Sequence, residues 1–263
     1  MYHSALLPDM RVRSGGLTWA RLMNSAGEGT DVSRMLGGTP YGSVADYVRG
    51  RASEDALKRV KSPRVLHLST HGFFLPDPPE RPPSEVAGVF GTKLQPPGGA
   101  AAVGLARLSA ASGISPLLRS GFVLAGANRL GEQLPRSPQT ARVEDGWVTA
   151  EEAALLGLSG TELAVLSACG TGLGTVPAGE GVYGLRRALR LAGVSTVVST
   201  LFDVPDQESA SLMRNFYIGF KSGQGKLTAL RGAQLRLIKE RRERGGAAHP
   251  FFWAGFVLSG DPN

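Results

Sequence analysis

Two residues that could take part in catalysis, a single cysteine and a histidine, each follow directly on a run made mostly of apolar or β-branched residues. Cys169 follows Leu163–Ala168 (LAVLSA), and His71 follows Arg64–Thr70 (RVLHLST). Both runs are bounded by turn signals, which predicts two strands. The carboxyl ends of parallel strands lie at one edge of a sheet, so adjacent strands would bring the thiol and the imidazole together. A thiolate nucleophile needs such a base, which usually comes from elsewhere in the sequence.

A glycine comes directly after each of these residues, Gly72 after His71 and Gly170 after Cys169. A backbone without Cβ lets a substrate approach closely and leaves an N–H free to donate to an oxyanion. The residue types alone leave a second interpretation open, a buried free cysteine with a histidine that caps a strand end. His67, inside the first strand, is expected to be a hydrogen-bonded core histidine.

Other site chemistries fit the sequence poorly. Gly170, Gly172 and Gly174 give G-x-G-x-G, which is neither the dinucleotide fingerprint nor a Walker loop. One cysteine and four scattered histidines, without an H-E-x-x-H motif, do not predict a metal site. A G-x-S-x-G elbow of a serine hydrolase is also missing from the sequence. We therefore expect no metal and no cofactor.

The remaining pattern predicts the elements that would position the pair. Strands and helices alternate, which predicts an α/β fold with a mostly parallel sheet and helices on both faces. Thr149 and Glu152 form a capping box that opens a short helix. The expected helices lie near 53–60, 150–156, 182–192, 205–220 and 227–238, and the further expected strands near 122–125, 194–202 and 251–258.

We expect two unequal parts along the chain. Residues 1–50 are weakly patterned and predict no strong element, and they are open to interpretation as a truncated start. Residues 51–263 form the expected domain, with a long Pro-, Gly- and Ala-rich loop at 76–115. A loop of this length is usually a lid, a processing segment or a disordered stretch.

The charge distribution and the lack of targeting patterns indicate which partners and which location to expect. The formal net charge is +7, but the densest basic run, Lys239–Arg244, is interrupted by two glutamates and lies late in a predicted helix. This arrangement favours a solvated helix end over a nucleic-acid interface. No apolar stretch reaches the length of a membrane span, and residues 1–30 lack a signal-peptide pattern. A single cysteine suits a reducing compartment, so a cytoplasmic location is expected.

Four blocks of the sequence, in order, closely resemble the CHAT domain, a caspase-like and separase-like family of cysteine peptidases (clan CD) that is often fused to TPR repeats. The resemblance extends from about Ala52 to Asp261 and implies a caspase-hemoglobinase-like fold. It also implies a His–Cys dyad, with the family's histidine on His71 and its cysteine on Cys169. The backbone N–H groups of Gly72 and Cys169 would then stabilise the oxyanion. The blocks are RVLHLSTHGFFLPD (64–77), SPLLRSGFVLAGANR (115–129), the segment 161–206 and HPFFWAGFVLSGD (249–261).

The resemblance implies peptide-bond hydrolysis through a thioester acyl-enzyme, with an inactive CHAT-like binding or signalling module as the alternative. Two departures lie beside the expected substrate cleft: Gly170 replaces an acidic or amide residue, and Thr200-Leu201-Phe202 replaces Ser-Leu-Trp. Substrate-binding candidates are Gly170, Phe202, Asp203 and Asp206. The two aspartates could receive a basic P1 side chain or could cap the helix that begins at Pro205. The expected partners are a polypeptide substrate and an upstream TPR or sensor domain or a partner protein, with no nucleic acid and no membrane.

Overall fold

The computed structural model describes residues 2–3, 19–38, 41–74, 117, 120–129, 146–170 and 180–263. The expected long loop, 76–115, lies outside these residues. Within the described part of the chain, no helix has the length and apolar character needed to cross a membrane.

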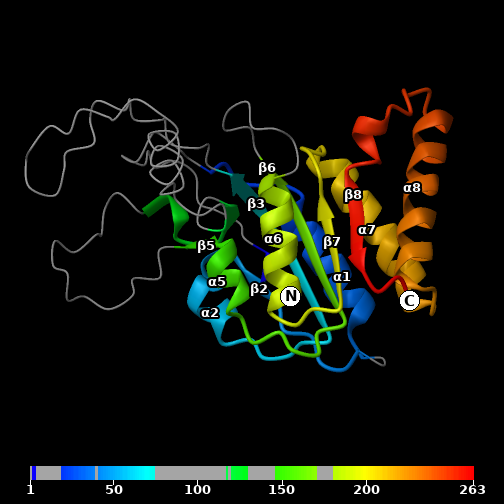
Figure 1. Cartoon of the computed structure of the whole chain (residues 1–263). Coiled ribbons are helices and arrows are strands. Elements are labelled where there is room, and N and C mark those ends of the chain that lie inside the picture. The colour runs from blue at the N-terminus through cyan, green and yellow to red at the C-terminus, as the bar shows by residue number, and fades with distance from the viewer. Residues whose placement is uncertain are drawn as a thin grey trace, which may run out of the picture.

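One sheet organises the described residues (Figure 1). Its strands follow the order β2-β1-β3-β6-β7-β8, and β4 and β5 branch from the end of β3. The pairs from β2 to β7 are parallel, whereas β8 and β4 run antiparallel to their neighbours. The mostly parallel sheet confirms the predicted fold class and is compatible with a caspase-like fold. The strands are β1 (Tyr2–His3), β2 (Tyr47–Val48), β3 (Val65–Phe74), β4 (Ser120–Val123), β5 (Trp147–Thr149), β6 (Leu163–Gly170), β7 (Thr196–Thr200) and β8 (Phe256–Gly260).

Helices cover both faces of the sheet, as the sequence predicts (Figure 1). The first layer holds α2 (Glu54–Lys58), α5 (Ala150–Ala154) and α6 (Glu180–Leu191), and the second holds α1 (Ser25–Leu36), α7 (Asp206–Lys221) and α8 (Lys226–Glu243). The shorter elements are the 3₁₀ turns η1 (Arg49–Arg51), η3 (Ala127–Arg129) and η4 (Pro250–Phe252).

The alternation of side chains along the central strands explains the two layers. Leu66 and Leu68 of β3 pack into the core beneath α5 and α6, together with Leu166 of β6. Leu163 and Val165 of β6 point the other way and pack with α1, α7 and α8. Both faces of β6 are buried, which is why its sequence is a continuous apolar run rather than an alternating one.

Local sequence signals account for several helix ends. The Ser53 hydroxyl caps α2 by accepting a hydrogen bond from the Ala56 N–H at 3.2 Å. The capping box predicted at the start of α5 is present, since Thr149 and Glu152 satisfy each other's backbone N–H groups. Gly193 follows α6 at φ +103°, where a Cβ would lie 2.6 Å from the Ser159 Cα. Glycine is therefore required at that turn.

Several elements differ from the expectation, among them the short strands β1, β2 and β5, which the sequence did not predict. Helix α1 lies in the N-terminal region for which no strong element was predicted. The strand expected over 251–258 begins only at Phe256, because Pro250–Phe252 forms a 3₁₀ turn. The His249 ring accepts a hydrogen bond from the Phe251 N–H and caps this turn, and proline at its first position fits its start.

Candidate active site

The ladder between β3 and β6 places His71 and Cys169 directly opposite each other. Adjacent strands lie about 4.8 Å apart, so the two backbone positions are neighbours at the carboxyl edge of the sheet. The sequence predicts this proximity, but it places both residues after their strands, whereas β3 continues to Phe74 and β6 to Gly170. The side chain of Cys169 lies outside the described residues. The imidazole of His71 is described and is 6 % exposed.

The hydrogen bonding of His71 determines which ring nitrogen is available as a base. Its Nε2 lies 2.6 Å from the Ala20 carbonyl oxygen. A carbonyl only accepts, so Nε2 carries the proton and donates, and Nδ1 keeps the lone pair. This Nδ1 is buried and has no hydrogen-bond partner among the described residues. The ring is thus held in the tautomer that leaves Nδ1 free to take a proton.

Burial and nearby charges act in opposite directions on this imidazole. Desolvation lowers the pKa of His71 from its ordinary value of 6.5, because burial disfavours the charged ring. The Ala20 carbonyl and the carboxylates of Asp206 and Asp203 oppose this shift, but burial dominates. A neutral imidazole is therefore favoured at pH 7, as a proton acceptor requires.

An aromatic cluster covers one side of the His71 ring. Trp19 lies against it with ring centroids 5.4 Å apart, and Trp147 meets Trp19 edge-on at 5.5 Å. Phe73 packs on Trp147 at 4.8 Å. The backbone of Trp19 is fixed by Asn128, whose side-chain amide accepts from the Trp19 N–H and donates to its carbonyl, both at 3.0 Å. Trp19 therefore contributes to the burial that lowers the pKa of the ring.

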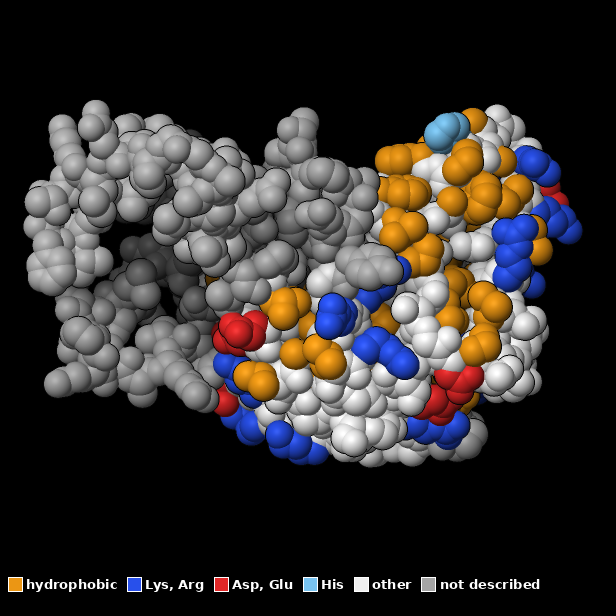
Figure 2. All heavy atoms as spheres, viewed as in Figure 1, with side chains coloured by type: hydrophobic (Ala, Val, Ile, Leu, Met, Phe, Trp, Pro, Cys, Tyr) orange, Lys and Arg blue, Asp and Glu red, His pale blue; other side chains and the backbone are white. Residues whose placement is uncertain are grey.

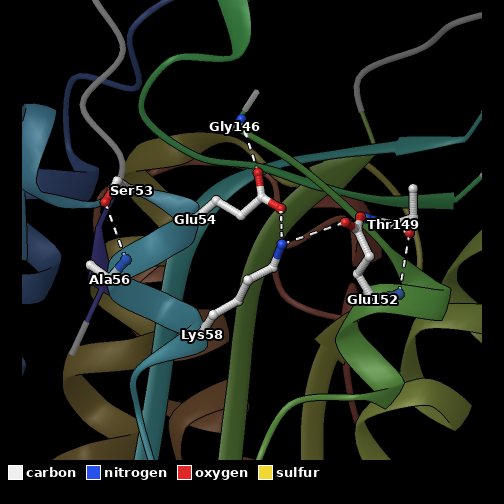
Figure 3. A network of polar contacts seen from close by, with 7 residues as sticks. All are labelled: Ser53, Glu54, Ala56, Lys58, Gly146, Thr149 and Glu152. Carbon is white, nitrogen blue, oxygen red and sulfur yellow. Dashed lines mark hydrogen bonds and ion pairs between the residues drawn. The ribbon is translucent and has the colours of Figure 1, made fainter. Parts of the chain in front are cut away.

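A polar network holds the strand that carries Trp147 (Figure 3). Buried Glu54 of α2 accepts a hydrogen bond from the Gly146 N–H at 3.1 Å, and the Lys58 ammonium lies 2.6 Å from the same carboxylate. Lys58 also reaches Glu152 of α5 at 3.6 Å. Gly146 itself sits at φ +81°, where a Cβ would lie 2.5 Å from the Ala127 N. The network therefore fixes the turn that leads into β5 and the aromatic cluster.

A second buried cluster lies under the site on the α1 side of the sheet. The Glu28 carboxylate is 2.8 Å from His67 Nε2, and the Tyr217 hydroxyl is 3.0 Å from His67 Nδ1. The hydroxyls of Ser69 and Ser167 donate to the other Glu28 oxygen at 3.4 Å. His67 is fully buried, which confirms its prediction as a hydrogen-bonded core residue. The cluster ties α1 to β3, β6 and α7.

The two glycines predicted beside the dyad occupy register partners on β3 and β6. Gly72 also pairs with Phe122 of β4, so it lies between two strands. A Cβ at Gly72 would contact the Gly121 carbonyl oxygen at 3.7 Å and Ala168 at 3.8 Å, which are ordinary packing distances. The packing on that side would therefore tolerate alanine at position 72. The N–H roles assigned to Gly72 and Cys169 stay predictions.

The other substrate-binding candidates lie after β7, the strand beside β6. Phe202 is 38 % exposed and stacks on Phe251 with centroids 6.4 Å apart. Figure 2 shows hydrophobic side chains gathered on this side of the molecule, near η4 and α8.

The two aspartate candidates, Asp203 and Asp206, act electrostatically on His71. The helix cap at the start of α7 is Pro205, without a side-chain cap hydrogen bond. Asp206 is instead bound to Asn24, which precedes α1.

Sequence reasoning missed the residues that contact the His71 ring from the N-terminal region. Trp19 and Ala20 lie in a stretch without a periodic pattern. The group that binds His71 is the backbone carbonyl of Ala20, which has no side-chain signature. The tryptophan was the available signal, since a large aromatic residue is usually buried against other side chains.

The model of the CHAT domain family matches residues 7–261, a range that includes Trp19, α1 and both strands of the site. None of the curated proteins matches the chain.

Proposed function

The chain belongs to the CHAT domain family, which is related to caspase-like cysteine peptidases, and from this we propose that it is a cysteine endopeptidase using a His71–Cys169 dyad. The observation that carries the proposal is the cross-strand register of these two residues, together with the free Nδ1 of His71. A neutral imidazole with a buried lone pair is a suitable acceptor for a thiol proton.

The reaction then runs in two halves. His71 Nδ1 takes the proton from Cys169 Sγ, and the thiolate forms a bond to the carbonyl carbon of the scissile peptide. The protonated Nδ1 gives its proton to the leaving nitrogen as the C–N bond breaks, which leaves a thioester on Cys169. Nδ1 next takes a proton from water, whose oxygen attacks the thioester as the C–S bond breaks, and this proton then returns from Nδ1 to Cys169 Sγ. The Nε2–H bond to the Ala20 carbonyl is retained throughout and stabilises the imidazolium in each half.

The oxyanion and substrate contacts complete the proposal. We assign the N–H groups of Gly72 and Cys169 to the oxyanion, and Gly170, Phe202 and Asp203 to substrate binding. Asp203→Ala should lower cleavage after Arg or Lys and leave cleavage after apolar residues unchanged, as scored by a P1 scan. Equal cleavage after basic residues in both proteins would show that Asp203 is not part of the pocket.

The proposed activity belongs in the cytoplasm, and an upstream sensor domain or a partner protein would regulate it.

The test compares the wild-type chain with Cys169→Ala and His71→Ala. Each is incubated with a mixture of unrelated unfolded proteins, and the new termini are sequenced by mass spectrometry. The proposal predicts cuts that share one P1 type and are absent with both variants. Cuts that persist with Cys169→Ala would contradict it. A chain that makes no cuts and whose thiol reacts with a peptide electrophile no faster than free cysteine is an inactive binding module.

A further inference from the structure

The segment Trp19–Asn24 holds the carbonyl that orients His71, and it is fastened at its two ends. Asn128 fixes Trp19 at one end by the two amide bonds described above. At the other end, Asn24 is the residue that precedes α1, and Asp206 binds it. Ala20 itself is fastened to His71. The position of its carbonyl therefore depends on the two ends of the Trp19–Asn24 segment.

Asp206 makes the contact at the second end from a distant part of the chain. Its Oδ2 accepts from the Asn24 backbone N–H at 2.8 Å and from the Asn24 side-chain amide at 3.0 Å. Because Asn24 donates two hydrogen bonds to the same oxygen, both its orientation and its distance from Asp206 are fixed. Asp206 is the first residue of α7, where the helix dipole also favours a carboxylate. The start of α7 is thereby joined to the start of α1.

Asp206 also acts on His71 through space, since its charge raises the pKa of the imidazole against the effect of burial. The substrate-pocket interpretation would place a cationic side chain on this same carboxylate. Its Oδ2 already accepts two hydrogen bonds, which uses the two lone pairs of that oxygen. The bonds to Asn24 give this carboxylate a role inside the protein, and because Oδ1 keeps its own lone pairs, the kinetic test below separates that role from a pocket role.

We propose that Asp206 is a positioning residue: by holding Asn24 it keeps the Trp19–Asn24 segment in place, and with it the Ala20 carbonyl against Nε2 of His71. The expected effect of Asp206 on catalysis rests on the proposed peptidase function. Its expected effect on the His71 tautomer does not, because that tautomer can be measured in a protein without activity. Both bonds to Asn24 are exposed, so Asp206 should affect alignment more than stability.

The chain offers a matched control in the same two helices. Asp31 of α1 pairs with Arg214 of α7, so it also joins α1 to α7 through one carboxylate. Asp31 lies within α1, past the Trp19–Asn24 segment. Asp31→Ala therefore removes an α1–α7 ion pair without releasing Asn24. Asn24→Ala is the complementary variant, because it removes the side-chain bond and leaves the Asp206 carboxylate intact.

The first readout is the ¹⁵N spectrum of the His71 ring at pH 7.5, recorded in the Cys169→Ala background. The expected result is Nε2-protonated imidazole in the parent protein and in Asp31→Ala. Asp206→Ala should give a mixture of tautomers, and Asn24→Ala a smaller change in the same direction. Asp206→Asn keeps an acceptor for the Asn24 N–H and should restore most of the parent tautomer. An unchanged tautomer in Asp206→Ala would overturn the proposal, whatever the outcome of the activity assays.

The second readout is kinetic, with the cysteine present and peptides of basic and apolar P1. Asp206→Ala should lower kcat for both peptides by about 100-fold, the loss typical of a catalytic group displaced by 1 Å. Asn24→Ala should also lower kcat for both. A loss confined to the basic peptide and absent from Asn24→Ala would show a pocket residue and overturn the positioning role. Thermal melts of Asp206→Ala and Asp31→Ala should agree closely, so that the difference in kcat is not a difference in folding.

Discussion

His71 and Cys169 are direct cross-strand partners in the parallel ladder between β3 and β6. This relationship follows from the chain itself, since each residue lies near the carboxyl end of a buried strand and the two strands are neighbours in the sheet. The structure adds what determines the state of the histidine. The Ala20 carbonyl selects its tautomer, and burial beside Trp19 keeps it neutral.

The depressed pKa of His71 predicts a pH dependence of stability. The unfolded chain binds a proton at this histidine near pH 6.5, whereas the folded state resists protonation until a lower pH. Stability should therefore fall as the pH drops below 6.5 and level off below the folded pKa. Urea denaturation at pH 7.5 and 5.5 measures this fall. His71→Asn should show a smaller fall than the wild type, and equal falls would contradict the buried neutral imidazole.

Trp19 should keep the His71 ring buried and its pKa low. Trp19→Ala removes an aromatic side chain that is only 4 % exposed, which admits water to the His71 ring. We expect the His71 pKa to rise towards 6.5, as followed by NMR titration of the imidazole. Truncation of a buried tryptophan should cost about 3–5 kcal/mol of unfolding free energy. Trp19→Phe should keep most of the unfolding free energy and most of the lowering of the His71 pKa. A His71 pKa that does not move in Trp19→Ala would show that other groups bury the ring.

Glu28 should matter for stability because three donors share its buried carboxylate. Glu28→Gln replaces one acceptor oxygen by an amide donor, so part of the cluster around His67 is left unsatisfied. A loss of about 1–3 kcal/mol is expected from denaturant unfolding. Glu243→Gln is the comparison, since its pair with Lys239 is solvent-exposed and should be worth less than about 1 kcal/mol. Equal losses from the two variants would contradict a tightly coupled cluster.

Two glycines of the site region should respond differently to alanine. Gly72→Ala keeps the N–H and adds a Cβ at ordinary contact distance, so folding should be preserved and peptide cleavage should change little. Gly121→Ala would place a Cβ 2.6 Å from the Phe73 ring and against the Val148 carbonyl, so it should destabilise the protein strongly. Thermal melts separate the two. A Gly72→Ala protein that folds like the wild type but cleaves 100-fold more slowly would show a need for glycine that packing does not explain.

The sequence predicts the parts of the site that have a local signature. Buried parallel strands are apolar runs, so Leu163–Ala168 could be recognised and Cys169 located at its end. Helix α1 has no such signature, because its sequence contains two glycines and buries a glutamate on the face that meets the sheet. The apolar residues after Pro250 look like a strand, yet a capped 3₁₀ turn precedes β8. The position of the Ala20 carbonyl depends on tertiary contacts alone and could not be predicted from residue types.

The most direct test of the central claim is the rate at which Cys169 reacts with a peptide electrophile. The chain has one cysteine, so every thiol adduct seen by intact mass arises at Cys169. At pH 7 the wild-type protein should react more than about tenfold faster than free cysteine, because His71 supplies the base that forms the thiolate. His71→Ala should lose this excess. Equal rates for the wild type, His71→Ala and free cysteine would contradict a working dyad.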